Sequence, residues 1–197
     1  DLATPDKRDD NVEGRNVYEI FNYQIAYEIR LQQAMEENLL CPFHYFGITD
    51  LSMIGDEEAA RDFNMLTSDE RVRHIVNQAD YYGYSGDKVK GLIFCSNIKE
   101  TEELSAKFNQ IINPATGKNF RTVALNGSAS EQERQDAFER LAMNEDESSE
   151  DRQPLDYIFS VEILNEGVDI VEVNQVIMLR PTQSPIVFIQ QLGRGLR

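Results

Sequence analysis

The chain has 197 residues, of which 41% are hydrophobic and 27% charged, a balance typical of a globular protein rather than a disordered one. Its 19 lysines and arginines against 35 aspartates and glutamates give a net charge of −16, which disfavours nonspecific binding to nucleic acid. No run of about 18 apolar residues occurs, so the sequence contains no candidate transmembrane helix.

The N-terminal part is predicted to be a polar tail followed by helices. Residues 1–15 are polar, and apolar positions at helical spacing extend from residue 17 to residue 40. The aromatic piece CPFHYFGITDL that follows is consistent with a short strand. A second helix is expected over residues 67–82, because Thr67 and Glu70 have the spacing of a capping box.

Strands and helices alternate in the remainder of the chain. The strands are predicted at GLIFCS (91–96), FRTVAL (120–125), LDYIFSV (155–161) and QVIMLR (175–180). Helices are predicted after Asn97, which has Glu100 at the capping-box position, after Ser130, which opens a helix that ends near Met143, and from Ser184-Pro185. This alternation predicts an α/β fold, a parallel sheet with helices on both faces.

The residues that follow each strand are the candidates for function, because such sheets bind ligands at the carboxyl ends of their strands. Ser96 and Asn97 lie at a helix start, where free N–H groups can hold a phosphate. Asn126, Gly127 and Ser128 follow the second strand, and the glycine permits a ligand to approach closely. A helix cap and an ordinary turn account for these residues equally well.

Two later segments carry further candidates. The loop EGVDI places Gly167 and Asp169 between two apolar strands, although a plain turn with a surface aspartate is an equal alternative. In the terminal QQLGRGLR, Arg194 and Arg197 are three residues apart and share a face of a helix or tight turn. Two planar guanidinium groups on one face suit a polyphosphate, and Gly193 allows it to approach.

An acidic segment, EDESSED at 145–151, precedes the third predicted strand. We interpret it as a solvated insertion, disordered or variable and not catalytic, so that its deletion leaves the activity of the complete enzyme intact. A regulatory decoy of a DNA site is the alternative.

The cysteines and histidines indicate a reducing compartment, but their spacing does not indicate a metal site. Cys41 and Cys95 are too few for a disulfide scaffold and favour an intracellular, reducing environment. His44 and His74 are far from each other and from the cysteines, so no metal site is expected. The start, DLATPDKRDD, has no apolar signal-peptide stretch and no initiator Met, and we interpret the chain as a fragment of a longer protein.

Four segments, in this order, resemble the motifs of the second RecA-like domain of superfamily 2 DEAD/DEAH-type helicases. GLIFCSNIKETEELS resembles motif IV, VALNGSASEQERQDAFERL motif IVa, FSVEILNEGVDIVEVNQVIML motif V and QQLGRGLR motif VI. Residues 17–51 resemble the stretch between the two RecA-like domains of bacterial helicases near the type I and type III restriction subunits. The chain is therefore expected to consist of a tail and helical linker, 1–84, and a helicase C-terminal domain, 85–197.

The resemblance implies an ATP-dependent motor. ATP and Mg²⁺ would be held mainly by a first RecA-like domain of the same parent protein, because no GxxxxGK[ST] or DExH-type motif occurs here. This chain alone is thus expected to be inactive as an ATPase. Arg194 and Arg197 match the arginine fingers, and Gln190 matches a residue near the γ-phosphate and the attacking water. The motif V loop, which contacts the nucleotide or couples it to nucleic acid, is matched by Gly167 and Asp169.

The resemblance also implies nucleic acid as a partner, with DNA favoured over RNA. The residues that match contacts to the phosphate backbone of one strand are Ser96, Asn97, Asn126, Gly127 and Ser128. Such contacts use backbone N–H groups and hydroxyls and so tolerate the charge of −16. No membrane association is expected, and the location implied is the cytoplasm of a bacterium.

Two departures from the family pattern leave alternatives open. Gln191 stands where many members have Arg, and Val161 where many have Thr. They favour a catalytically inactive helicase-like module that binds nucleic acid or a partner. A third interpretation is an unrelated parallel α/β domain that binds a small phosphorylated ligand at the same strand ends.

Overall fold

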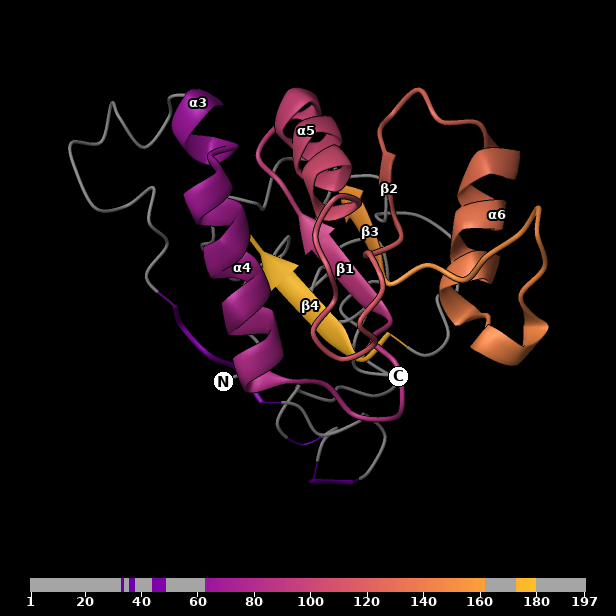
Figure 1. Ribbon diagram of the computed structural model, residues 1–197. Coiled ribbons are helices and arrows are strands. Elements are labelled where there is room, and N and C mark those ends of the chain that lie inside the picture. Colours follow the sequence, from indigo (N-terminus) through magenta and orange to yellow (C-terminus); the bar gives the residue numbers. More distant parts are fainter. Residues whose placement is uncertain (1–32, 34–35, 38–43, 49–62, 162–172, 180–197) are drawn as a thin grey trace, which may run out of the picture. The chain divides into compact units, whose positions relative to one another are not determined.

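The computed structural model describes residues 33, 36–37, 44–48, 63–161 and 173–179. The helices are α3 (Phe63–Leu66), α4 (Asp69–Tyr82), α5 (Ile98–Phe108) and α6 (Glu131–Ala142), with a short 3-10 helix, η3 (Glu145–Glu147) (Figure 1). The strands are β1 (Gly91–Phe94), β2 (Thr122–Leu125), β3 (Tyr157–Ser160) and β4 (Gln175–Met178). Residues 44–48, from the aromatic piece considered as a strand, form no regular structure.

The four strands form one parallel sheet in the order β2-β3-β1-β4 (Figure 1). In the middle of the sheet, Leu92 of β1 pairs with Ile158 of β3 on one side and with Val176 of β4 on the other. Ile158 in turn pairs with Val123 of β2. The parallel sheet predicted from the alternation of elements is confirmed.

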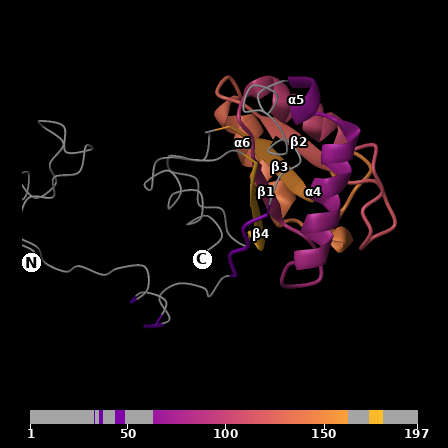
Figure 2. The same ribbon diagram turned by 90° about the vertical axis from the view of Figure 1, so that its left-hand side faces the viewer.

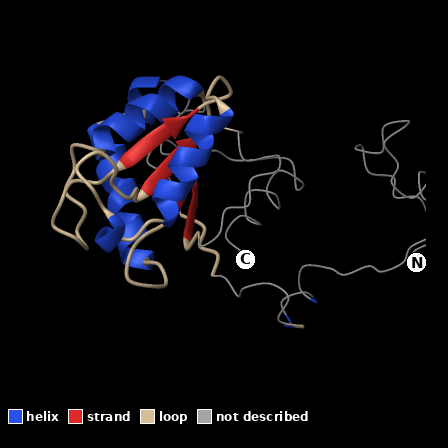
Figure 3. Cartoon of the chain, turned by 90° about the vertical axis from the view of Figure 1, so that its right-hand side faces the viewer, coloured by secondary structure: helices blue, strands red, loops and turns tan. Residues whose placement is uncertain are grey.

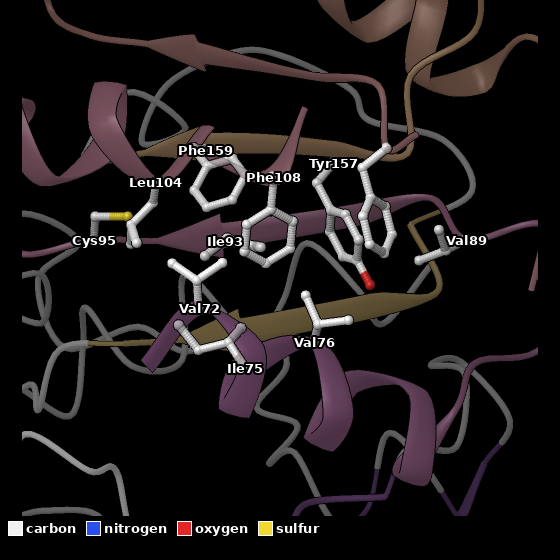
Figure 4. Packing of buried hydrophobic residues seen from close by; sticks show 11 residues of the cluster. Val72, Ile75, Val76, Val89, Ile93, Cys95, Leu104, Phe108, Tyr157 and Phe159 are labelled. Atoms are coloured by element: carbon white, nitrogen blue, oxygen red, sulfur yellow. The ribbon is translucent and has the colours of Figure 1, made fainter. Parts of the chain in front are cut away.

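Helices cover both faces of the sheet, because alternate strand residues point to opposite sides. Ile93 and Phe159 pack with apolar residues of α4 and α5 (Figure 4), whereas Leu92, Phe94 and Ile158 pack with α6. Figure 2 shows the sheet between α4 and α6, and Figure 3 shows the helices in blue on either side of the red strands. The α/β class with helices on both faces is therefore confirmed.

The start of α4 differs by one residue from the sequence prediction. Its N-cap is Ser68, whose side chain accepts a hydrogen bond from the N–H of Arg71, and not Thr67. Thr67 is buried, and its carbonyl accepts a hydrogen bond from Lys107 of α5, so tertiary contacts decide where the helix begins. The predicted domain boundary at residue 84 stays a prediction. Helix α4, which precedes this boundary in the sequence, packs against the sheet.

The acidic segment is more ordered than its composition predicts. It contains η3, and Glu145 forms ion pairs with Arg121, which directly precedes β2, and with Lys118 at 3.8 Å. Asn144 donates its N–H to Glu147 at 2.8 Å. Regular structure within the segment is limited to η3, and residues 148–151 form neither helix nor strand and are exposed, so the expectation of a disordered or variable segment stays a prediction for them. Its dispensability for activity stays a prediction.

Gly91, the first residue of β1, is required by the packing of an aromatic ring. A Cβ at this position would lie 2.2 Å from two ring atoms of Tyr157. That ring cannot move away easily, because it is buried and its hydroxyl donates to Gln175 Oε1 at 2.6 Å.

We therefore expect Gly91→Ala to lower the free energy of unfolding by about 1–3 kcal/mol or more, the cost of overpacking a core. Denaturant unfolding of the chain measures this change. Gly47→Ala is the matched control, because a Cβ there meets nothing within 4 Å. Equal stabilities of the two variants would contradict this account of Gly91.

Two lysines donate hydrogen bonds to the carbonyls at the C-terminal end of α6. Lys88 Nζ donates to the carbonyl of Met143 at 2.8 Å, and Lys90 Nζ donates to that of Ala142 at 2.9 Å. These carbonyls are among the last of the helix and have no intrahelical partner. Burial lowers the pKa of Lys88 to about 8, although the charge of Asp156 opposes the shift.

The pKa of Lys88 predicts a pH dependence of stability. An unfolded chain keeps the ordinary lysine pKa of 10.5, so between about pH 8 and that value it binds more protons than the folded chain. The contribution of Lys88 to the free energy of unfolding must therefore rise with pH across this window. We expect the free energy of unfolding of the wild type, minus that of Lys88→Met, to rise from about pH 8 to pH 10 in urea titrations. A constant difference would show that the folded-state pKa is not lowered.

Candidate functional site

The described part of the predicted site lies at the edge of the sheet where the strands end. Ser96 and Asn97 follow β1, and Asn126–Ser128 follow β2. Because β1 and β2 both pair in parallel with β3, the two segments leave the sheet at the same edge. Four of these five residues are exposed, and Asn126 is half-buried. The structure thus brings the predicted nucleic-acid residues to one accessible edge.

At the start of α5, side chains of the protein already accept hydrogen bonds from some of the free backbone N–H groups. The Asn97 side chain accepts a hydrogen bond from the N–H of Glu100 at 2.9 Å, which confirms the predicted cap. The Glu100 carboxylate reaches back to the N–H of Ser96 at 2.7 Å and not to that of Asn97. A ligand would therefore meet the Ser96 hydroxyl and the first-turn N–H groups other than that of Glu100, which have no intrahelical acceptor.

After β2, Asn126 builds the turn that the sequence predicts. Its Oδ1 accepts hydrogen bonds from the N–H and the hydroxyl of Ser128, at 3.0 and 2.5 Å, and its carbonyl accepts from Ala129 at 3.0 Å. A Cβ on Gly127 would meet nothing within 4 Å. The turn itself does not need a glycine for space, and the open approach at Gly127 is available to a ligand.

Arg134 supports this turn, although the sequence analysis assigned it no role. It lies in the first turns of α6, directly after the capping box that Ser130 and Glu133 form at the start of the helix. Its Nη2 donates to the carbonyl of Gly127 at 3.4 Å. Within the described part of the chain, its buried Nε has no hydrogen-bond partner. The sequence contained one signal for this role: Arg134 is four residues after the N-cap Ser130, and this spacing places its side chain beside the loop that precedes α6.

The residues predicted on the nucleotide side lie outside the described part of the chain. They are Gly167, Asp169, Gln190, Gly193, Arg194 and Arg197. Gln191 lies there too, whereas Val161 is half-buried directly after β3. The last described residue before the arginine-bearing segment is Leu179, whose N–H donates to Phe94 O at 2.9 Å.

Within the described ranges, the remaining titratable residues form no second centre. Cys95 is fully buried, and burial raises the pKa of its thiol to about 12, so it stays protonated as a core residue. Cys41 lies outside the described residues. Among the residues that the structure describes, no group of three or more His, Cys, Asp or Glu side chains could hold a metal ion. No helix in the same residues is long and apolar enough to cross a lipid bilayer.

Comparison with known proteins places this site in a family. The family described as helicase conserved C-terminal domain matches residues 70–197. Among solved structures, the chain is similar to a DEAD box protein from the hyperthermophile Methanococcus jannaschii, with 19% sequence identity and a TM-score of 0.46. That similarity covers 64% of this chain and 29% of the other, so the chain spans less than a third of that protein. No curated protein matches the sequence. Since the family match extends over well over half of the residues, the chain belongs to the helicase conserved C-terminal domain family.

Proposed function

We propose that this chain is the second motor domain of an ATP-dependent DNA helicase or translocase. The family match over residues 70–197 carries the proposal, because it includes both described strand-end loops and the arginine-bearing C-terminal segment. In this role Arg194 and Arg197 stabilise the charge that develops on the transferring phosphoryl group. Gln190 lies near the γ-phosphate and the attacking water in the same proposal.

The proposed nucleotide site is shared with a second domain. A first RecA-like domain of the same protein holds most of the ATP and the Mg²⁺, and Gly167, Asp169 and Gly193 contact the nucleotide from this side. The chain by itself is then inactive as an ATPase. An intracellular bacterial protein related to the restriction-type helicases fits this proposal, and that relationship is the reason to favour DNA over RNA.

Hydrolysis of ATP by the complete protein, with and without duplex DNA, tests the proposal. The same assay on this chain alone is the comparison. We expect DNA-stimulated turnover by the complete protein and none by the chain. An inactive complete protein that still binds DNA would favour a helicase-like binding module instead. That second candidate is supported by Val161 and Gln191, which lack the hydroxyl and the charge common in the family.

A charge placed in the turn after β2 tests the proposed nucleic-acid contact. Ser128 is exposed beside the open approach at Gly127, so Ser128→Asp would set a carboxylate against a phosphate. We expect affinity for a DNA oligonucleotide to fall about 10-fold or more, because opposed like charges cost several kcal/mol. Ser148→Asp, in the acidic segment, is the control with the same change of charge and is expected to bind as the wild type does. Equal losses in both variants would mean that only net charge matters.

A further inference from the structure

A fully buried ion pair lies next to the strand ends that carry the candidate site. Arg71 of α4 and Glu100 of α5 are 2.7 Å apart, Nη1 to Oε1, and both side chains are 0% exposed. Both groups lose their hydration on burial, and apolar residues of similar volume often stabilise a fold as well or better. Stability alone is therefore a poor explanation for a charged pair at this place.

The hydrogen bonds of the pair reach the chain at the ends of two neighbouring strands. Glu100 Oε2 accepts from the N–H of Ser96, beyond the end of β1, at 2.7 Å. Arg71 Nη2 donates to the carbonyl of Leu179, directly after β4, at 3.4 Å. The N–H of Leu179 donates in turn to Phe94, the last residue of β1. The two exits from the sheet are thus held by one connected set of bonds.

The Arg71 guanidinium has a third anchor. Its Nη1 also donates to the carbonyl of Leu66, the last residue of α3, at 2.5 Å. A guanidinium presents its donors in a fixed planar fork, so it sets the relative positions of all the acceptors that it contacts. An apolar side chain of the same size would fill the space but would not fix these positions.

We propose that Arg71 and Glu100 are positioning residues that couple the loop after β1 to the chain after β4. The loop after β1 carries Ser96 and the cap of α5, which are proposed to contact nucleic acid. The chain after Leu179 leads to the segment that holds the proposed arginine fingers. The inference rests on the proposed function and adds to it a physical link, inside this domain, between nucleic-acid binding and phosphoryl transfer.

The test replaces the pair by apolar residues in the complete protein. Arg71→Met/Glu100→Leu removes both charges together, so the melting temperature should change by no more than about 5 °C, because the lost bonds are offset by the relieved desolvation. We expect kcat of DNA-stimulated ATP hydrolysis to fall about 10-fold or more with a smaller change in KM, because small misplacements of catalytic groups cost rate.

Lys107→Met is the matched control. Lys107 also joins α5 to α4, through Asp69 at 2.6 Å, but this pair is partly exposed and its contacts lie at the start of α4 rather than at the strand ends. Its substitution should leave turnover as in the wild type. Wild-type kcat in the double variant would overturn the proposal, as would an equal loss of turnover in the control.

Two further measurements cover the other outcomes. If the double variant does not fold, Arg71→Lys decides, because a lysine keeps the charge but cannot reach the same acceptors together. Retained turnover in that variant would overturn the proposal, and reduced turnover with a native melting temperature would support it.

If the wild-type protein hydrolyses no ATP, the proposed function fails. The role of the Arg71–Glu100 pair is then tested by the affinity of the wild type and of the double variant for a DNA oligonucleotide. Weaker binding by the double variant than by the wild type then supports positioning of Ser96. Equal binding by the two proteins, or no detectable binding by the wild type, overturns it.

Discussion

Replacing Arg197 by alanine in the complete protein is expected to lower kcat for ATP hydrolysis by about 10³-fold or more, the size of effect that an arginine finger supplies. Arg194→Ala should have a comparable effect, because both residues are proposed to stabilise charge on the transferring phosphoryl group. We expect the fold to survive both changes. Steady-state kinetics at saturating ATP and DNA, with a thermal melt of each variant, measures the two quantities.

Arg152→Ala is the control for these variants. Arg152 is an arginine with 42% of its side chain exposed, and its guanidinium bonds Asp136 and Glu139 on the surface of α6. Its loss should leave turnover unchanged. If Arg194→Ala and Arg197→Ala hydrolyse ATP at the wild-type rate, these arginines are not fingers, and the inactive helicase-like module becomes the better interpretation.

The largest loss of stability is expected from Arg71→Ala. This change leaves the Glu100 carboxylate, which is 0% exposed, without the guanidinium that neutralises it. Breaking one partner of such a buried pair costs about 3–5 kcal/mol, whereas replacing both partners by apolar residues is far milder. Urea unfolding of the chain measures the free energy. We therefore expect Arg71→Ala to be less stable than Arg71→Met/Glu100→Leu.

Lys107→Ala shows how much stability is lost with a partly exposed ion pair between the same two helices. The partners of that ion pair, Lys107 and Asp69, are 27% and 69% exposed, so its loss should cost about 1 kcal/mol or less. The side-chain hydrogen bond and the charge of Lys107 lower the pKa of Asp69, but solvent weakens the effect on stability. An Arg71→Ala variant as stable as Lys107→Ala would mean that Glu100 finds water or another partner.

The local elements of this protein could be predicted from its sequence because each signal is local. Asn97 and Ser130 are separated from the N–H groups that they cap by three residues, so their role can be recognised without tertiary information. The apolar runs and the helices between them likewise predicted a parallel sheet. Since parallel strands end at the same edge of a sheet, the sequence also predicted that Ser96 and Asn126 lie at one edge.

Tertiary structure alone decided which distant residues meet. The strand order β2-β3-β1-β4 depends on packing, and so does the pairing of Arg71 with Glu100 across 29 residues of sequence. Composition predicted a disordered or variable acidic segment, and it did not reveal that Glu145 pairs with Arg121, which lies 24 residues earlier in the chain. Glu100 has the spacing of a local capping residue, yet its carboxylate binds Ser96 and Arg71, because burial makes a nearby guanidinium the stronger partner. Spacing along the chain determines helices, caps and turns, whereas charge neutralisation in a buried environment depends on the folded arrangement.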